Sequence, residues 1–211
     1  YALLGYSLYD VMETRDGMPR AKAAAAKALA IDPTLPEPYA ALGWVHFHHD
    51  WDWEGAEQAF RRAVELGPEI ATTRHWYSFF LAGMGRAEGA QEQARRAWKL
   101  DPLAPIINAN LAQPAFHARR FDECAAAARK IVELEPGFAV GHYWLALVAA
   151  VQGRWGEAMQ SVAAFGECFG PTTRTQALTG YCLGRRGQSD DARAELAALR
   201  TIAAERPVPA Y

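Results

Sequence analysis

The sequence predicts an all-α fold, a solenoid built from stacked antiparallel helix pairs. The main observation is a fixed period of 34 residues, at which a small residue recurs: Ala56, Ala90, Cys124, Ala158 and Ala192. A proline keeps the same interval at Pro68, Pro102 and Pro136. A period of this length indicates supersecondary units that cannot bury their apolar faces alone and bury them by stacking.

Each unit reads as two apolar stretches joined by a turn. Several of the turns carry a glycine, at Gly85, Gly153 and Gly187. The second stretch has the recurrent small residue followed by apolar residues four and seven positions later, as in Ala56, Phe60 and Ala63. This spacing places three side chains on one face of a helix. The closing proline ends the second helix, since it cannot continue one.

The units are predicted as one solenoid over residues 1–211. Five full units are expected, at 36–70, 71–104, 105–138, 139–172 and 173–206. Residues 1–35 form a partial first unit with an insertion, where "YALLG" ends one helix and "MPRAKAAAAKALAIDP" forms the next. Residues 207–211 begin a further unit or a tail. The ends of a solenoid expose apolar faces that capping repeats usually cover, so we expect the native protein to be longer.

One first helix is expected to be distorted. Pro114 falls inside the first helix of the third unit. There it removes a backbone hydrogen bond and clashes with the preceding turn, so a kink is predicted.

Composition excludes several functional classes. Lys and Arg number 22 against 24 Asp and Glu, no basic run occurs, and nucleic-acid binding by this segment is therefore not expected. The three cysteines fit no zinc pattern, although a bond between Cys168 and Cys182 stays open. No apolar run approaches the roughly 20 residues that a membrane helix needs. No phosphate-binding loop or nucleophile elbow is present, so neither catalysis nor a cofactor is expected.

The stretch "HFHHDWDW", from His46 to Trp53, has two interpretations. His46, His49 and Asp50 could bind a metal ion, because histidine and carboxylate are metal ligands. Helical zinc sites, however, usually use an i, i+4 pair and a third ligand from elsewhere. The alternative is a structural turn, in which Asp52 caps the helix that begins near Trp53. The structural interpretation is favoured.

These units resemble the tetratricopeptide repeat (TPR) family. The resemblance depends on the period and on large–small pairs in the first helices: Leu42-Gly43, Tyr77-Ser78, Leu111-Ala112 and Leu145-Ala146. It implies a right-handed superhelix whose first helices line a concave surface that binds peptides. Segments such as "HDWDWEGAEQAFRRAVELGP" and "FAVGHYWLALV" also resemble the carboxyl-terminal TPR region of bacterial multidomain regulators with winged-helix, serine/threonine kinase or adenylate-cyclase domains. The expected location is the cytoplasm, or the periplasm if the full-length protein has a membrane span.

The repeat register of that family assigns a candidate partner-binding surface. It consists of Trp44, Phe47, His48, His75, Phe79, Gln113, Phe116, His117, Tyr143, Leu147, Tyr181 and Arg185. Aromatic side chains give large contact area and dominate binding hot spots. The Lys and Asn clamp with which some members hold chaperone tails is absent, because only Asn110 matches it.

The expected function is therefore a non-enzymatic scaffold that binds a protein or peptide within a larger bacterial signalling or regulatory protein. Two alternatives stay open. One is a sensor of a small molecule or metal ion. The other is self-association through the exposed ends of the solenoid.

Overall fold

The computed structural model describes residues 14–170 and 172–205. All regular structure in these ranges is helical, which confirms the all-α prediction. The segment "YALLG" and residues 207–211 lie outside the described residues. The chain divides into two compact units, residues 1–118 and residues 119–211. The division falls inside the predicted 105–138 repeat, and the repeat boundaries themselves stay a prediction.

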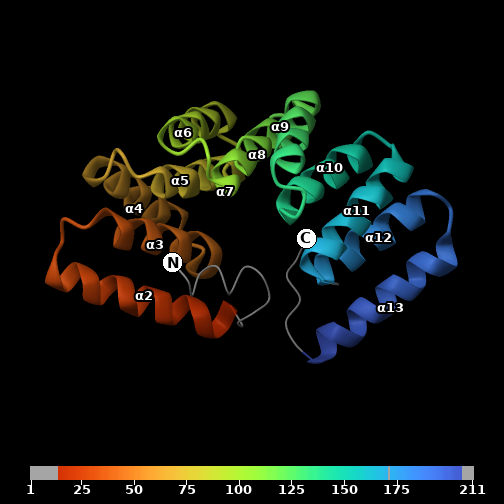
Figure 1. Cartoon of the computed structure of the whole chain (residues 1–211). Helices are drawn as coiled ribbons and strands as arrows, with labels where there is room; N and C mark the ends of the chain where they lie inside the picture. The colour runs from red at the N-terminus through yellow and green to blue at the C-terminus, as the bar shows by residue number, and fades with distance from the viewer. Residues whose placement is uncertain (1–13, 171, 206–211) are drawn as a thin grey trace. The chain divides into compact units, whose positions relative to one another are not determined.

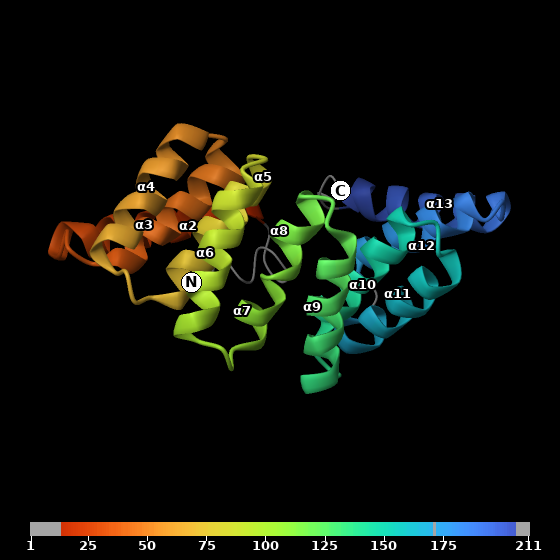
Figure 2. The same ribbon diagram turned by 90° about the horizontal axis from the view of Figure 1, so that it is seen from above.

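Unit 1 contains seven α-helices and one π-helical turn among its described residues. They are α2 (Thr14–Ile31), α3 (Pro36–Val45), η1 (His46–Asp50), α4 (Trp53–Leu66), α5 (Ala71–Gly83), α6 (Ala87–Leu100), α7 (Pro105–Ala109) and α8 (Ala112–His117). In Figure 1 and Figure 2, α3 lies beside α4 and α5 lies beside α6.

Unit 2 contains five helices among its described residues. They are α9 (Phe121–Leu134), α10 (Ala139–Val151), α11 (Trp155–Phe169), α12 (Thr173–Arg185) and α13 (Ser189–Glu205). Here α10 packs against α9 and α11, and α12 packs against α13 (Figure 2). Helix pairs joined by short turns therefore recur in both units.

The core of unit 1 is organised around Phe60. This side chain is fully buried, and its ring centroid lies 5.8 Å from that of Tyr77 and 5.6 Å from that of Phe80. A Cβ atom at Gly43 would lie 3.0 Å from the Phe60 ring. Glycine at this position therefore lets α3 approach α4 closely enough for the ring to fill the space between them.

The next helix pair uses a small polar residue at the equivalent place. Ser78 in α5 is fully buried, and its hydroxyl donates a 2.7 Å hydrogen bond to the carbonyl oxygen of Ala90 in α6. In unit 2, the buried core includes Ala149, Ala150, Ala158 and Cys182. The three cysteines are free, so the possible Cys168–Cys182 bond is not formed.

A recurrent hydrogen bond closes the junction between successive helix pairs. In four places, a side chain donates to the carbonyl oxygen of the proline six residues earlier: Tyr39 to Pro33, Arg74 to Pro68, Asn108 to Pro102 and His142 to Pro136. The distances run from 2.8 to 3.2 Å. His142 must carry its proton on Nε2 to take part. Each bond satisfies a carbonyl that lies beyond the end of a second helix.

The first helix of the predicted third repeat is interrupted by more than a kink. It ends as α7 at Ala109 and starts again as α8 at Ala112. Pro114 is the third residue of α8 and has no N–H to offer the carbonyl of Asn110. The helix is therefore interrupted next to the Asn110 carbonyl, between α7 and α8.

The last helix differs from the other second helices in burial. Ala56, Phe60 and Ala63 of α4 are fully buried, whereas Leu196, which is four periods after Phe60, is 46% exposed. No described residue of α13 is buried. Among the described residues, α13 packs mainly against α12.

We expect the same substitution at these two equivalent positions to have different costs. Phe60→Ala should lower the free energy of unfolding by about 3–5 kcal/mol, because it leaves a cavity in the core. Leu196→Ala should cost less than about 1 kcal/mol, because its side chain is only partly removed from water. Urea denaturation followed by circular dichroism measures both. Equal losses would contradict the burial difference.

Candidate functional site

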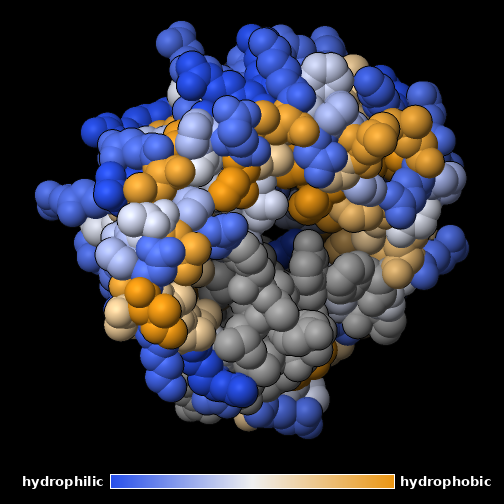
Figure 3. All heavy atoms as spheres, turned by 60° about the vertical axis from the view of Figure 1, so that its left-hand side comes forward, coloured by the Kyte–Doolittle hydropathy of each residue, from blue (hydrophilic) through white to orange (hydrophobic). Residues whose placement is uncertain are grey.

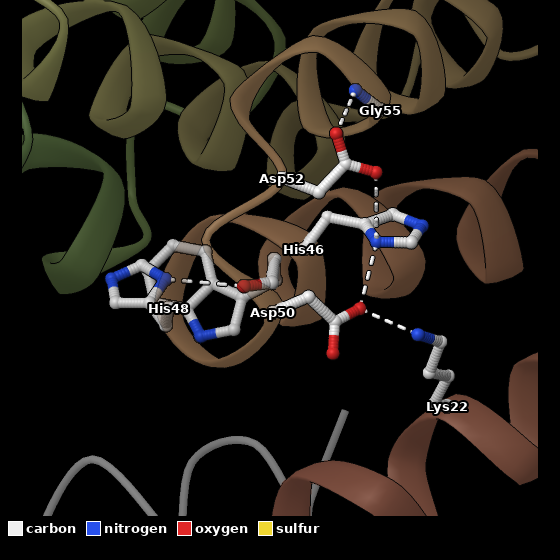
Figure 4. Close-up of polar contacts among 7 residues, drawn as sticks. Lys22, His46, His48, Asp50, Asp52 and Gly55 are labelled. Carbon is white, nitrogen blue, oxygen red and sulfur yellow. Dashed lines mark hydrogen bonds and ion pairs between the residues drawn. The ribbon is translucent and has the colours of Figure 1, made fainter.

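The stretch from His46 to Trp53 forms a turn that Asp52 closes (Figure 4). η1 continues α3 by one π-helical turn, and Trp51 then adopts a left-handed conformation with φ of 57°. Asp52 is the N-cap of α4, and its Oδ1 accepts a 2.9 Å hydrogen bond from the backbone N–H of Gly55. The predicted capping role of Asp52 is confirmed.

His46 lies between the two carboxylates of this turn (Figure 4). Its Nδ1 is 2.8 Å from Oδ2 of Asp50 and 3.8 Å from Oδ2 of Asp52. Lys22 of α2 donates a 2.5 Å hydrogen bond to the same Asp50 oxygen. Burial opposes ionisation of Asp50, but the bond and charge of Lys22, together with His46, outweigh it and lower its pKa.

These contacts connect α2 to η1, and they already engage the side chains of His46 and Asp50. The ammonium group of Lys22 and Nδ1 of His46 both contact Oδ2 of Asp50. Within residues 14–170 and 172–205, no three His, Cys, Asp or Glu side chains are arranged to hold a metal ion. Of the three residues of the metal interpretation, His46 and Asp50 contact each other, and the interpretation itself is not tested by this geometry.

Five rings of α3, η1 and α5 pack together next to this turn. We call them the aromatic cluster: Trp44, Phe47, His48, Trp76 and Phe79. The His48 ring stacks on Trp44 with centroids 4.1 Å apart and an interplanar angle of 25°. Trp44 also lies 5.1 Å from Trp76 and 5.2 Å from Phe79. Since these residues come from α3, η1 and α5, the cluster joins successive first helices.

His48 is held in its neutral form within the cluster. Burial lowers its pKa to about 4, against the opposing effect of the Trp44 carbonyl. Nδ1 lies 3.2 Å from that carbonyl oxygen, so it carries the proton and donates (Figure 4). His75 in α5 behaves alike, because burial lowers its pKa to about 4 and the Asn110 side chain opposes the shift only in part.

The candidate residues of unit 1 differ in accessibility. Trp44, His75 and Gln113 are buried, with exposed fractions of 2%, 8% and 5%, so they pack inside the protein and offer no free surface. The partly buried candidates are Phe47, His48, Phe79 and Phe116. His117 is exposed.

Sequence reasoning missed Trp76, a full member of the cluster. The register places His75 and Phe79 on the inner face and leaves Trp76 between faces. A signal was available, because Trp76 lies three residues from Phe79 and four from Phe80, spacings at which helical side chains are neighbours. Lys22 was missed because its partner Asp50 is 28 residues away.

In unit 2, α10 and α12 carry the candidates, and we call their surface the α10–α12 face: Tyr143, Leu147, Arg174, Tyr181 and Arg185. The guanidinium carbon of Arg174 lies 5.0 Å from the Tyr143 ring centroid. That of Arg185 lies 5.4 Å from the ring of Trp155, which in turn contacts Tyr181 edge-on at 6.0 Å. Tyr181 is 52% exposed. Aromatic and cationic groups are therefore combined here.

The surface is mixed in polarity. Figure 3 shows apolar side chains reaching the surface in patches among hydrophilic ones on the face in view. None of the helices within the described ranges is long and apolar enough to cross a membrane.

Removal of the Asp52 cap should weaken α4. Asp52→Ala should cost about 1 kcal/mol of unfolding free energy, because the N–H of Gly55 loses its acceptor. Asp52→Asn keeps an acceptor oxygen and should recover most of the loss. Urea denaturation measures the three proteins. An alanine variant as stable as the parent would contradict the capping role.

Stability should fall on acidification. Both His48 and His75 have pKa values lowered from 6.5 to about 4 in the folded protein. Between pH 6.5 and 4 the unfolded chain therefore binds more protons than the folded chain. The stability that the two neutral histidines contribute is fully present above pH 6.5 and is lost as the pH falls toward 4. The loss should reach on the order of 3 kcal/mol per histidine.

Chemical denaturation at pH 7.5, 6.0 and 5.0 tests this dependence. His48→Phe keeps a stacked ring but cannot titrate, so the difference in stability between pH 7.5 and 5.0 should shrink. An unchanged difference in this variant would show that His48 does not carry the effect.

No family model matches the sequence, and no curated protein matches it. The structure is similar to that of PilW, a widely conserved type IV pilus biogenesis factor, with a TM-score of 0.73 and 18% identity over 98% of this chain and 92% of that one. It is similar to TTC0263, a thermophilic TPR protein in Thermus thermophilus, with a TM-score of 0.71 and 17% identity over 78% and 89%.

A third similar structure is YrrB, a TPR protein with an unusual peptide-binding site. Its TM-score is 0.53, with 16% identity over 85% of this chain and 92% of that one. Identities this low show the fold alone. The chain therefore has the helical-repeat fold of TPR proteins.

Proposed function

We propose that this chain is a scaffold that binds a peptide or an extended segment of another protein on its first helices. The surfaces are the accessible part of the aromatic cluster in unit 1 and the α10–α12 face in unit 2. The observation that carries the proposal is the partial or full exposure of aromatic residues on these helices: Phe47, His48, Phe79, Tyr143 and Tyr181. Such rings provide contact area at small entropic cost.

The second helices present a different surface. Their arginines pair with carboxylates one helical turn away, as in Arg61–Glu57 at 2.6 Å and Arg96–Glu92 at 2.5 Å. Exposed pairs of this kind contribute little to stability and keep the surface hydrated. Apolar contact with a partner is therefore better supported on the first helices.

The fold comparison agrees with this proposal, since YrrB has a peptide-binding site on the same kind of scaffold. A helical-repeat fold supports many functions, so the proposal depends on the surface of this chain. The resemblance of the sequence to bacterial multidomain regulators supports a regulatory, cytoplasmic role within a longer protein. The chain itself supplies binding rather than catalysis.

A random library of 12-residue peptides displayed on phage tests the proposal. We expect selected peptides, once synthesised, to bind in fluorescence anisotropy measurements. Phe79→Ala or Tyr181→Ala should weaken the binding of a selected peptide about tenfold, as hot-spot truncations do. Leu134→Ala is the matched control, because Leu134 is a 68% exposed apolar residue on the second helix α9.

Two outcomes would contradict the proposal. One is a library from which no peptide is retained. The other is binding that depends on Leu134 as strongly as on the aromatic residues, which would place the contact on the second helices.

Self-association is a second candidate function, favoured by the open face of α13. Leu196 is 46% exposed, although its periodic equivalent Phe60 is fully buried. If copies of the chain cover this face, the mass measured by sedimentation velocity should rise with concentration, and Leu196→Glu should abolish the rise. A monomer at all concentrations would exclude this candidate.

A further inference from the structure

We infer that the α10–α12 face binds an acidic peptide segment, in which carboxylates flank an apolar residue. This inference rests on the proposed function and specifies the chemistry of the partner. It starts from the distribution of charge in unit 2. α10 contains no Asp, Glu, Lys or Arg, and α12 contains Arg174 and Arg185 but no carboxylate.

The carboxylates of unit 2 lie on the other helices. α11 carries Glu157 and Glu167, and α13 carries four: Asp190, Asp191, Glu195 and Glu205. The chain as a whole has a formal charge of −2. The α10–α12 face is therefore a cationic surface on an otherwise slightly acidic protein.

Arg185 differs from Arg154 and Arg193 in its partners. Arg154 pairs with Glu157, and Arg193 pairs with Asp190 at 2.8 Å, each with a carboxylate three residues away in the sequence. Arg185 has no carboxylate on its own helix, and no ion pair forms between it and another described residue. Instead it lies over the Trp155 ring.

Stacking on a ring leaves an arginine able to bind an anion. A guanidinium group that lies over an aromatic face still has N–H donors around its edge, in a fork that matches a carboxylate. Arg74 in unit 1 shows the contrast, because it is 6% exposed and donates to Pro68 and Gln93. Arg185 is exposed.

An apolar strip separates the two cations. Arg174, Tyr181 and Arg185 follow each other at helical spacings of seven and four residues, so they share one face of α12. Tyr181 is 52% exposed between the arginines. The peptide therefore needs an apolar side chain between its two acidic positions.

Helix geometry sets the spacing of those positions. The two arginines are eleven positions apart in α12, and a helix rises 1.5 Å per residue, so they lie roughly 16 Å apart along the axis. An extended chain rises about 3.3 Å per residue and spans this length in about five residues. Carboxylates about five residues apart would reach both arginines.

A peptide fits this face better than a nucleic acid. Single-stranded nucleic acids bind along continuous basic grooves in which many phosphates are neutralised. Here two arginines lie on either side of Tyr181, and α10 and α12 offer no further cation. A phosphate backbone is charged at every nucleotide, whereas a peptide can carry its charges at the two arginines alone.

The same phage library tests this inference through the charge of the selected peptides. Panning at low salt should enrich peptides with acidic residues on both sides of an apolar residue. A synthetic peptide of the most enriched sequence should lose at least about tenfold in affinity with Arg174→Glu/Arg185→Glu, a change of about 1.4 kcal/mol. Arg129→Glu/Arg200→Glu is the matched control, because it makes the same charge change on the exposed surface of α9 and α13.

Each outcome is decisive. Circular dichroism melting of both double variants establishes that they are folded. Selected peptides without acidic enrichment, or equal losses in the two double variants, would overturn the inference and leave the proposed function standing. A library that retains nothing would remove both. A labelled 12-residue oligoadenylate that binds more tightly than the peptides and is lost in Arg174→Glu/Arg185→Glu would show that the face binds nucleic acid instead.

Discussion

The close approach of the two helices in a pair is the constraint on which the rest of the structure depends. Phe60 fills its site only because Gly43 has no side chain, and a Cβ atom there would lie 3.0 Å from the ring. Ser78 meets the backbone of Ala90 directly through its hydroxyl. A small residue on one helix thus determines which side chain the other can present. A small residue recurs at this place in the next first helix, and the 34-residue period of small residues in the second helices repeats the pattern along the chain.

The sequence is sufficient to predict the features that depend on local chemistry or on period. The helix pairs follow from repeated small and apolar residues, the cap at Asp52 from a carboxylate before a helix, and the break around Asn110 from Pro114. The closing bonds to the repeat prolines could not be predicted. Their donors are Tyr39, Arg74, Asn108 and His142, four side chains with no shared pattern except their position. The structure, rather than the residue type, gives these positions a common role.

The candidate site was harder to predict than the fold for a related reason. A helical period shows which face of a first helix points inward, but it does not separate the residues that reach solvent from those that the next pair covers. Trp44 and Phe79 belong to one cluster with centroids 5.2 Å apart, yet Trp44 is buried and Phe79 is partly exposed. His75 and Gln113 are likewise covered by packing. Whether an inward-facing residue is buried or exposed depends on the positions of the neighbouring helices.

The two helices of a pair differ in how their arginines are neutralised. A second helix has a surface turned toward water, and it can neutralise its arginines with carboxylates one turn away. A first helix uses its inner positions for aromatic packing, which leaves few places for such carboxylates. An arginine placed there stacks on a ring, as Arg174 and Arg185 do on Tyr143 and Trp155. Since α12 has no carboxylate of its own, a ligand from outside can supply one to the exposed guanidinium of Arg185.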